Sequence, residues 1–199
     1  VADCDLLAMA MPFPVMVRSY QLSTEEMRQA DQPLLDRLAA RGFKLDMGGE
    51  GNTGFQMKYM QRGGGYYFNV GCSDLVADGE IGLLHFDQID RFVAQGARLK
   101  DGSTVAADLI VAATGYKNQQ EVVRAHLGDE VADRAGPVWG FGDDGELRNM
   151  WRRTPQPGLW FTAGSLAQCR IYSKYLALQI KAIEEGLIDL AAPSRPPSI

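Results

Sequence analysis

The sequence predicts an α/β fold, and two apolar runs carry that prediction. The first, Leu109 to Ala113, is rich in β-branched residues and has the length of a buried strand. The second, Leu159 to Ala163, stops at a glycine and leads directly into a helical pattern that continues to Glu185. Strands that alternate with helices in this way are typical of α/β proteins.

Helical patterns dominate the N-terminal part of the chain. Residues 5 to 17 are apolar but contain Pro12 and Pro14, so we expect a helical start that ends as an extended segment. Apolar residues then recur at helical spacing, which predicts a helix over residues 24 to 41 with a kink near Pro33. These residues form the first helical part of the predicted fold.

Residues 48 to 54 contain a formal match to the glycine pattern of dinucleotide-binding loops, G-x-G-x-x-G, at Gly49, Gly51 and Gly54. A dinucleotide-binding loop must lead into a crossover helix. Only the segment from Phe55 to Gly63 separates the match from the next glycine run, and it is too short for that helix. We therefore interpret the match as a flexible turn around one short helix.

Short strand-like segments lie between the glycine runs and the first apolar run. They cover residues 66–70, 81–84, 91–93 and 98–100, with turn residues between them. Asp101-Gly102 is a hairpin signal, and residues 104 to 106 continue the pattern. The sequence thus predicts a small β-meander that leads into a long buried strand at residues 108 to 113.

A polar helix is predicted over residues 119 to 135, with its end at the next glycine. Residues 139 to 148 have the pattern of a hairpin that turns at Gly142 to Gly145. The carboxylates in that turn, Asp143 and Asp144, have the spacing of a catalytic pair. Because a glycine-flanked turn favours solvent exposure, we interpret them as a solvated loop tip.

Composition excludes several classes of function. A formal net charge of −5 and a pI of 5.1 leave no basic surface for nucleic acid. No apolar run reaches the length of ~18 residues that a membrane span needs. The chain begins at Val1 without an initiator methionine or a signal-peptide pattern, which indicates a cytoplasmic protein or a piece cut from a longer one.

Metal binding is not expected either. Cys4, Cys72 and Cys169 are spread far apart without a Cys-x-x-Cys pair, and only two histidines accompany them. We interpret them as buried or half-buried free thiols in a reducing compartment. The sequence also contains no recognisable Ser-His-Asp set, so it assigns no catalytic acid or base.

Two turns are candidate contacts for a cofactor. The first apolar run ends abruptly at Thr114-Gly115-Tyr116, where small residues would let a backbone approach a flat or phosphorylated ligand. Gly164-Ser165 lies between the second apolar run and a long amphipathic helix. The free N–H groups and the dipole at such a helix N-terminus favour phosphate or a carbonyl oxygen.

Two motifs carry a resemblance to a known family. Ala-Ala-Thr-Gly-Tyr at residues 112 to 116 follows the first apolar run, and Pro-Gly-Leu-Trp-Phe-Thr-Ala-Gly-Ser at residues 157 to 165 precedes the last helix. Together and in this order they resemble the class B flavoprotein monooxygenases, which include flavin-containing and Baeyer–Villiger monooxygenases. The resemblance covers nearly the whole chain but only the C-terminal portion of that family.

The resemblance implies the end of a flavoprotein with two Rossmann-like dinucleotide-binding domains. In that family an FAD domain carries an inserted NADPH domain, and each has a G-x-G-x-x-G loop. Neither loop, nor the family's Phe-x-Gly-x-x-x-His signature, is found here in usable context, so both loops are expected upstream of Val1. Residues 1–116 would be the C-terminal part of the NAD(P)H domain, with a helical insertion and the β-meander. Residues 117–192 would return to the FAD domain as its closing strand and helix, and residues 193–199 would be a disordered tail.

The resemblance also implies two groups of cofactor-binding residues. The crossing point between the two domains would contain Thr114, Gly115 and Tyr116. The turn beside the flavin and the first turn of the last helix would supply Gly164, Ser165, Leu166 and Gln168. Many flavoproteins with two such domains have Asp where this chain has Ser165, although a serine can still form a hydrogen bond there.

Five further polar residues have two interpretations each. Arg170 and Tyr172 are placed to contact the isoalloxazine ring, or they form the surface and the core edge of the last helix. Arg148, Arg152 and Arg153 would attract an NADPH phosphate, or they form a solvated basic face, which we favour.

The resemblance implies that the chain is the C-terminal fragment of an FAD- and NADPH-dependent monooxygenase, an enzyme that inserts one oxygen atom from O2 into a small organic substrate. The fragment alone is expected to be inactive and not to bind FAD tightly. Its partners would be the substrate, O2, the missing N-terminal part of the same protein and, in a homo-oligomer, a second copy. Two alternatives stay open, a flavin-dependent NAD(P)H oxidoreductase that does not oxygenate and a non-catalytic binding module derived from a flavoenzyme.

Overall fold

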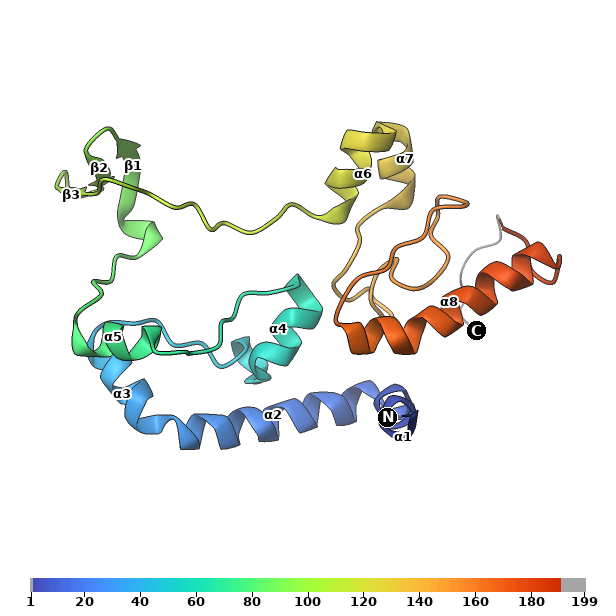
Figure 1. Ribbon diagram of the computed structural model, residues 1–199, viewed down its shortest axis with the longest axis horizontal. Coiled ribbons are helices and arrows are strands. Elements are labelled where there is room, and N and C mark those ends of the chain that lie inside the picture. The colour runs from blue at the N-terminus through green and yellow to red at the C-terminus, as the bar shows by residue number, and fades with distance from the viewer. Residues whose placement is uncertain (1, 191–199) are drawn as a thin grey trace. The chain divides into compact units, whose positions relative to one another are not determined.

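The computed structural model describes residues 2–190, a mixed arrangement of helices with one small sheet (Figure 1). Contacts divide the chain into two compact units. Unit 1 comprises Val1–Glu25, Met47–Tyr66 and Lys117–Ile199, and unit 2 comprises Glu26–Asp46 and Tyr67–Tyr116. The predicted tail, residues 193–199, lies outside the described residues.

The helices and strands follow one another in a simple order. The helices are α1 (Ala2–Ala10), α2 (Phe13–Ala30), α3 (Gln32–Ala40), α4 (Gly54–Arg62), α5 (Cys72–Asp78), α6 (Gln119–Leu127), α7 (Asp129–Ala135) and α8 (Leu166–Glu184). Short 3-10 turns occur at η1 (Gly49–Gly51) and η2 (Phe86–Gln88). The strands are β1 (Ile89–Val93), β2 (Gly96–Leu99) and β3 (Thr104–Ala106).

The helical start expected before the prolines is present as α1, which ends at Ala10, but a second helix follows in place of the expected extended segment. We expected an extended segment after Pro12, but α2 begins at Phe13, and Pro14 lies in its first turn. The main-chain oxygen of Pro12 accepts hydrogen bonds from the amides of Val15 and Met16. A first-turn proline costs a helix nothing, because its missing N–H would have no helical partner there.

The helix predicted over residues 24–41 is present, but it starts earlier and is interrupted. α2 ends at Ala30 and α3 begins at Gln32, so the predicted kink near Pro33 is a break at Asp31. Pro33 lies in the first turn of α3. The helix ends as expected at Gly42, which has a positive φ of 84°.

In unit 1, the glycine-rich loop serves a packing role. Gly49–Gly51 form η1, and Gly54 begins the nine-residue helix α4, so the prediction of a turn around one short helix is confirmed. Gly54 has a φ of 65°, and a Cβ atom built on it would lie 2.3 Å from Oγ1 of Thr24 in α2. The loop therefore uses glycine where α4 starts in close contact with α2.

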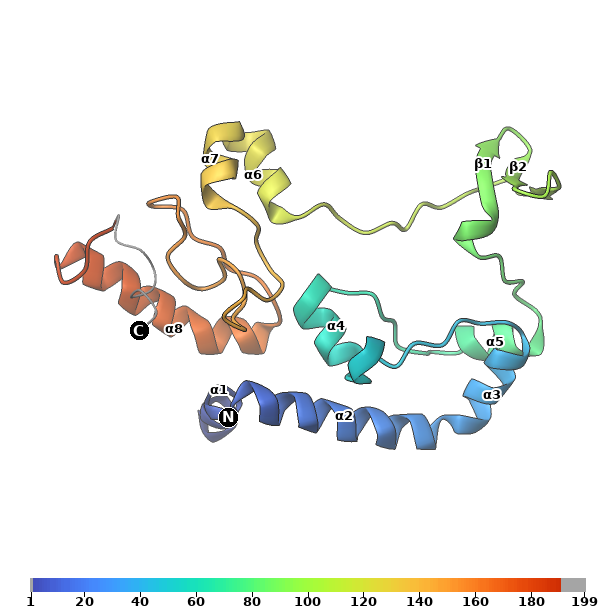
Figure 2. The ribbon, with the colours of Figure 1, turned by 180° about the vertical axis from the view of Figure 1, so that it is seen from behind.

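The core of unit 1 lies among α6, α7, α8 and the segment between α7 and α8. Its buried members are Val123, Ala132, Ala135, Val138, Met150, Trp151, Phe161 and Leu176. Helices α6 and α7 lie side by side in both views (Figures 1 and 2). We predicted one helix over residues 119–135, but Gly128, with φ 87° and ψ 171°, separates two helices.

The predicted hairpin at residues 139–148 is confirmed. The amide of Trp139 donates a hydrogen bond of 3.0 Å to the main-chain oxygen of Arg148, and Phe141 forms an antiparallel bridge with Leu147. The strand predicted at Leu159–Ala163 is wrong, because only an isolated parallel bridge joins Phe161 to Met150. In the described part of the chain, no neighbouring strand extends that bridge into a ladder.

In unit 2, the helix α3 packs against α5, and a three-stranded antiparallel sheet follows with the order β1-β2-β3. The Asp101-Gly102 turn joins β2 to β3 as predicted, and Gly102 has a φ of 88°. The strands expected at residues 66–70 and 81–84 are absent from the described structure. The β-meander is therefore smaller than the sequence predicts.

The long buried strand predicted at residues 108–113 is the largest error. Among the described residues this segment belongs to no strand, and every residue from Asp101 to Asn118 is exposed. The Leu109 and Val111 side chains are 80% and 77% exposed. A strand needs a hydrogen-bonding partner on at least one side, and the described residues provide none for this segment.

Candidate functional site

The two groups of predicted cofactor-binding residues belong to different units. Thr114, Gly115 and Tyr116 end unit 2, whereas Gly164 to Gln168 lie in unit 1 at the start of α8. Each group is therefore described by itself.

The Thr114-Gly115-Tyr116 turn is fully open to solvent. All three residues are exposed, and Gly115 has a positive φ of 77° that favours glycine. The Tyr116 side chain has full exposure. The backbone of this turn is accessible to a ligand, as the sequence analysis expects of a cofactor contact.

The start of α8 is a well-formed helix cap. The Ser165 hydroxyl accepts a hydrogen bond of 3.2 Å from the amide of Gln168, and Oε1 of Gln168 accepts one of 3.0 Å from the amide of Ser165. This reciprocal capping box satisfies two backbone donors. Gly164, Ser165, Leu166 and Ala167 are exposed, and Leu166 reaches 88%. The first turn of α8 therefore presents its backbone to solvent, at the end of a helix that favours negative charge.

A tyrosine from α4 reaches this cap. The Tyr59 hydroxyl donates a hydrogen bond of 2.8 Å to the same Oε1 of Gln168. Nε2 of Gln168 lies 3.7 Å from Sδ of Met60, also on α4. Burial raises the pKa of Tyr59 above its usual value, so this hydroxyl stays protonated and acts as a donor.

The hairpin at residues 139–148 holds Tyr59 from the other side. The indole Nε1 of Trp139 donates to the main-chain oxygen of Tyr59 at 2.9 Å, and the two rings meet edge to face with centroids 5.3 Å apart. Trp139 has a φ of 73°, which is strained for an aromatic residue. The hydrogen bond and the ring contact fix this conformation.

Two of the other polar candidates on α8 are already engaged within unit 1. Arg170 forms two hydrogen bonds with the Asp5 carboxylate of α1, at 2.6 and 2.8 Å. The Tyr172 ring stacks on Trp151, and burial raises its pKa. The interpretation as helix surface and core edge fits both residues better than a contact with the isoalloxazine ring.

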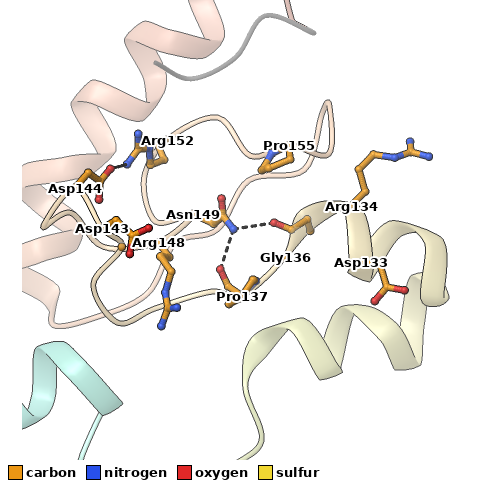
Figure 3. Close-up of a pocket in the computed structure, with 12 residues that line it drawn as sticks. Asp133, Arg134, Gly136, Pro137, Asp143, Asp144, Arg148, Asn149, Arg152 and Pro155 are labelled. Carbon is orange, nitrogen blue, oxygen red and sulfur yellow. Dashed lines mark hydrogen bonds and ion pairs between the residues drawn. The ribbon is translucent and has the colours of Figure 1, made fainter. Parts of the chain in front are cut away.

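A second candidate site is a pocket of about 550 Å³ beside the C-terminal end of α7 (Figure 3). It is lined on one side by the end of α7 and on the other by the hairpin turn and the segment after it. Asn149 lies between these parts and donates from Nδ2 to the main-chain oxygens of Ala135 and Pro137, at 2.7 and 2.8 Å. These bonds hold Asn149 at a φ of 57°.

The arginines near this pocket are bound within the chain. Arg152 pairs with Asp144 at 3.4 Å, Arg148 donates from Nε to the main-chain oxygen of Trp139 at 3.3 Å, and Arg153 donates to the main-chain oxygen of Asp189 at 2.9 Å. Asp144 is only 14% exposed, so the solvated loop tip we expected applies to Asp143 but not to Asp144. The pocket therefore carries mixed charge rather than a phosphate-binding cluster of arginines.

The described residues offer no cluster for a metal ion, and they contain three free thiols. Residues 2–190 contain no group of three His, Cys, Asp or Glu side chains placed to hold a metal ion. The three cysteines are free, but Cys4 and Cys72 are exposed, which corrects the expectation of buried or half-buried thiols. No helix between Ala2 and Glu184 has both the length and the apolar character of a membrane span.

Tyr59 and the role of Trp139 beside it were not predicted from the sequence. Ser165 and Gln168 have the spacing of a capping box, so a local pattern marks that pair. Tyr59 lies far from them in the sequence and appears there only as an aromatic residue on a short helix. Comparison with known proteins adds no further candidates, because no protein-family model matches this sequence and the curated proteins contain no significant match.

Proposed function

We propose that this chain is the C-terminal part of an FAD- and NADPH-dependent monooxygenase that inserts one oxygen atom from O2 into a small organic substrate. The exposed apolar segment at Leu109–Ala113 carries the proposal. Its residues are apolar on both sides of the chain, which is the pattern of an internal strand covered by helices on both faces of a parallel sheet. The segment ends at the Thr114-Gly115-Tyr116 turn of the motif that resembles the family.

The segment needs partners that the rest of unit 2 does not supply. An open dinucleotide-binding sheet would supply hydrogen-bonding strands on its two edges and helices on its two faces. Burial of Leu109 and Val111 in such a sheet would contribute roughly 2 kcal/mol per side chain. The proposal therefore accounts for an apolar segment that is costly to leave in water.

The start of α8 fits part of a flavin site. Leu166 and Ala167 are exposed residues at the positive end of a 19-residue helix, where first-turn amides suit a carbonyl or phosphate oxygen. Oε1 of Gln168 already accepts two hydrogen bonds, so this side chain offers a flavin only its amide hydrogens. FAD would supply the redox chemistry, and Gly164, Ser165 and Leu166 would orient its ring.

The remaining parts of the proposal follow from the resemblance. The whole protein would be cytoplasmic, would take NADPH as reductant, and would have the FAD pyrophosphate loop outside residues 2–190. This chain alone would bind FAD weakly, because η1 and the start of α4 form a packed turn rather than a pyrophosphate loop. A second copy of the whole protein is the expected partner if it forms an oligomer.

The test is to express the protein from its own start codon. We expect a yellow product that retains flavin, consumes NADPH and transfers oxygen to a ketone or a heteroatom-containing probe. Absence of flavin absorbance after reconstitution with FAD would contradict the proposal. Flavin binding with NADPH consumption, but with peroxide as the only product, would identify the non-oxygenating oxidoreductase instead.

A further inference from the structure

We infer that Tyr59 is a positioning residue for the proposed cofactor contact at the start of α8. This inference rests on the proposed function. It starts from the hydrogen bond of 2.8 Å between the Tyr59 hydroxyl and Oε1 of Gln168. That oxygen also accepts the amide of Ser165, so Tyr59 contacts the capping box through Gln168.

The Gln168 side chain packs closely against the turn before α8. A Cβ atom built on Gly164 would lie 2.2 Å from Oε1 of Gln168 and 3.1 Å from the Tyr59 hydroxyl oxygen. The amide group of the Gln168 side chain thus lies against the Gly164 backbone, and the Tyr59 hydroxyl lies close to both. Gly164 has a φ of 101°, a conformation that favours glycine. The turn before α8 is therefore fixed by contacts from α4 as well as by its own cap.

Tyr59 is itself fixed by a third segment. Trp139 donates to the main-chain oxygen of Tyr59 and packs against its ring. The hydroxyl is partly buried, and that burial strengthens a hydrogen bond by limiting competition from water. The hydrogen bonds from Trp139 to Tyr59 and from Tyr59 to Gln168 thus connect the hairpin to the cap, and all three residues lie in unit 1.

The role of this path is preorganisation. With Gln168 turned toward Tyr59 and Ser165, the amides of Leu166 and Ala167 keep one direction before a ligand arrives. A ligand oxygen then binds without first ordering the turn, which improves affinity. Without the tyrosine hydroxyl, Gln168 still accepts the Ser165 amide, so α8 stays capped while the turn becomes more mobile.

The experiment compares Tyr59→Phe with Tyr175→Phe. The first keeps the ring that packs on Trp139 and removes only the hydroxyl. The second makes the same change on α8, where Tyr175 is 43% exposed. Amide exchange and FAD-induced amide shifts are both followed by NMR on this chain, with FAD at concentrations high enough for weak binding.

We expect Tyr59→Phe to raise amide exchange at Ser165 and Gln168 about fivefold and to weaken FAD binding by about the same factor, the effect of one neutral hydrogen bond. Tyr175→Phe should change neither. Unchanged exchange in Tyr59→Phe would overturn the inference, as would faster exchange with unchanged FAD binding. If FAD shifts no amide of residues 164–168 in any variant, the proposed cofactor contact itself is wrong, and exchange would still show whether Tyr59 orders the cap.

Discussion

The core of unit 1 and the segment from Asp101 to Asn118 are both rich in apolar residues, but they reach opposite states. In the core, Val138 is fully buried among helices and a hairpin that are close to it in the chain. In the segment, Val111 is 77% exposed. The same residue type is thus buried in one region and exposed in the other, so the apolar character of the side chain does not explain the difference.

Backbone hydrogen bonding explains why the core is buried while the segment is exposed. The helices around Val138 satisfy their backbone groups internally, so they can collect apolar side chains without any external partner. A β-type segment satisfies its backbone only through another strand. Residues that fold as helices and hairpins therefore satisfy their backbone hydrogen bonds with nearby parts of the same chain. A segment with the pattern of an internal strand can do so only when neighbouring strands are present.

The largest effect is expected where the start of α4 packs tightly against α2 in unit 1. Gly54→Ala adds a Cβ atom 2.3 Å from Oγ1 of Thr24 at a φ of 65°. We expect it to destabilise unit 1 by about 3 kcal/mol, from backbone strain and a steric clash together. Urea unfolding followed by tryptophan fluorescence measures this, because Trp139, Trp151 and Trp160 all lie in unit 1.

Gly49→Ala is the matched control for that change. Gly49 has a similar φ of 71°, but a Cβ atom built on it meets nothing within 4 Å. We expect a loss of about 1 kcal/mol, from backbone strain alone. Equal losses in the two variants would show that the contact between α2 and α4 is loose in solution.

The second prediction applies one substitution to both regions. Val138→Ala removes two methyl groups from a fully buried site and should lower the free energy of unfolding by about 2 kcal/mol. Val111→Ala, at an exposed site, should change it by less than ~0.5 kcal/mol. Calorimetry of the whole chain compares them. A large loss for Val111→Ala would mean that the segment is buried in solution, in this chain or by a second copy.

The third prediction concerns the residue at which the exposed segment enters the folded unit. The Asn118 side chain accepts the amide of Gln120 at 2.9 Å and donates to the main-chain oxygen of Val138 at 2.7 Å. Asn118→Ala should cost about 1.5 kcal/mol through the lost helix cap and the unsatisfied oxygen. Asn118→Ser keeps the cap and should lose less. Equal urea midpoints for the wild type and Asn118→Ala would show that the Asn118 side chain does not stabilise unit 1.

The smallest effect concerns pH. The hydrogen bond from Arg170 holds the pKa of Asp5 below its usual value. The ion pair therefore stabilises unit 1 above the ordinary carboxyl pKa, and this contribution is lost as the pH falls through the lowered pKa. The melting temperature of Asp5→Asn should equal that of the wild type in strong acid and should be slightly lower than that of the wild type at neutral pH. The opposite order would disprove the assignment.

Local sequence signals predicted the helix ends and the hairpin turn. Gly186, with a φ of 68°, ends the α8 region as its position in the sequence indicated, and the glycines around Asp143 turned the hairpin as expected. Both depend on residues a few positions apart, where backbone preference decides the outcome. The helix break near Pro33 was predictable for the same reason.

Signals that depend on distant partners failed or were missing. The pattern of Leu109–Ala113 is typical of a strand, but a pattern cannot show whether neighbours are present in the same chain. Pro14 was expected to stop a helix because its position within the helix was unknown. For the candidate site, the exposed turn at Ser165 was predictable, while its contact with Tyr59 depends on tertiary packing alone.

The exposed apolar segment at Leu109–Ala113 also affects how the protein behaves at high concentration. A flat apolar stretch with unpaired backbone groups is a template for its own copies, and such pairing grows with concentration. Asp108 and Lys117 flank the stretch with opposite charges, in the position where charged residues limit stacking of strands. Neutralising both of these exposed side chains would remove that protection, so we expect the double variant to self-associate at a lower concentration than the wild type.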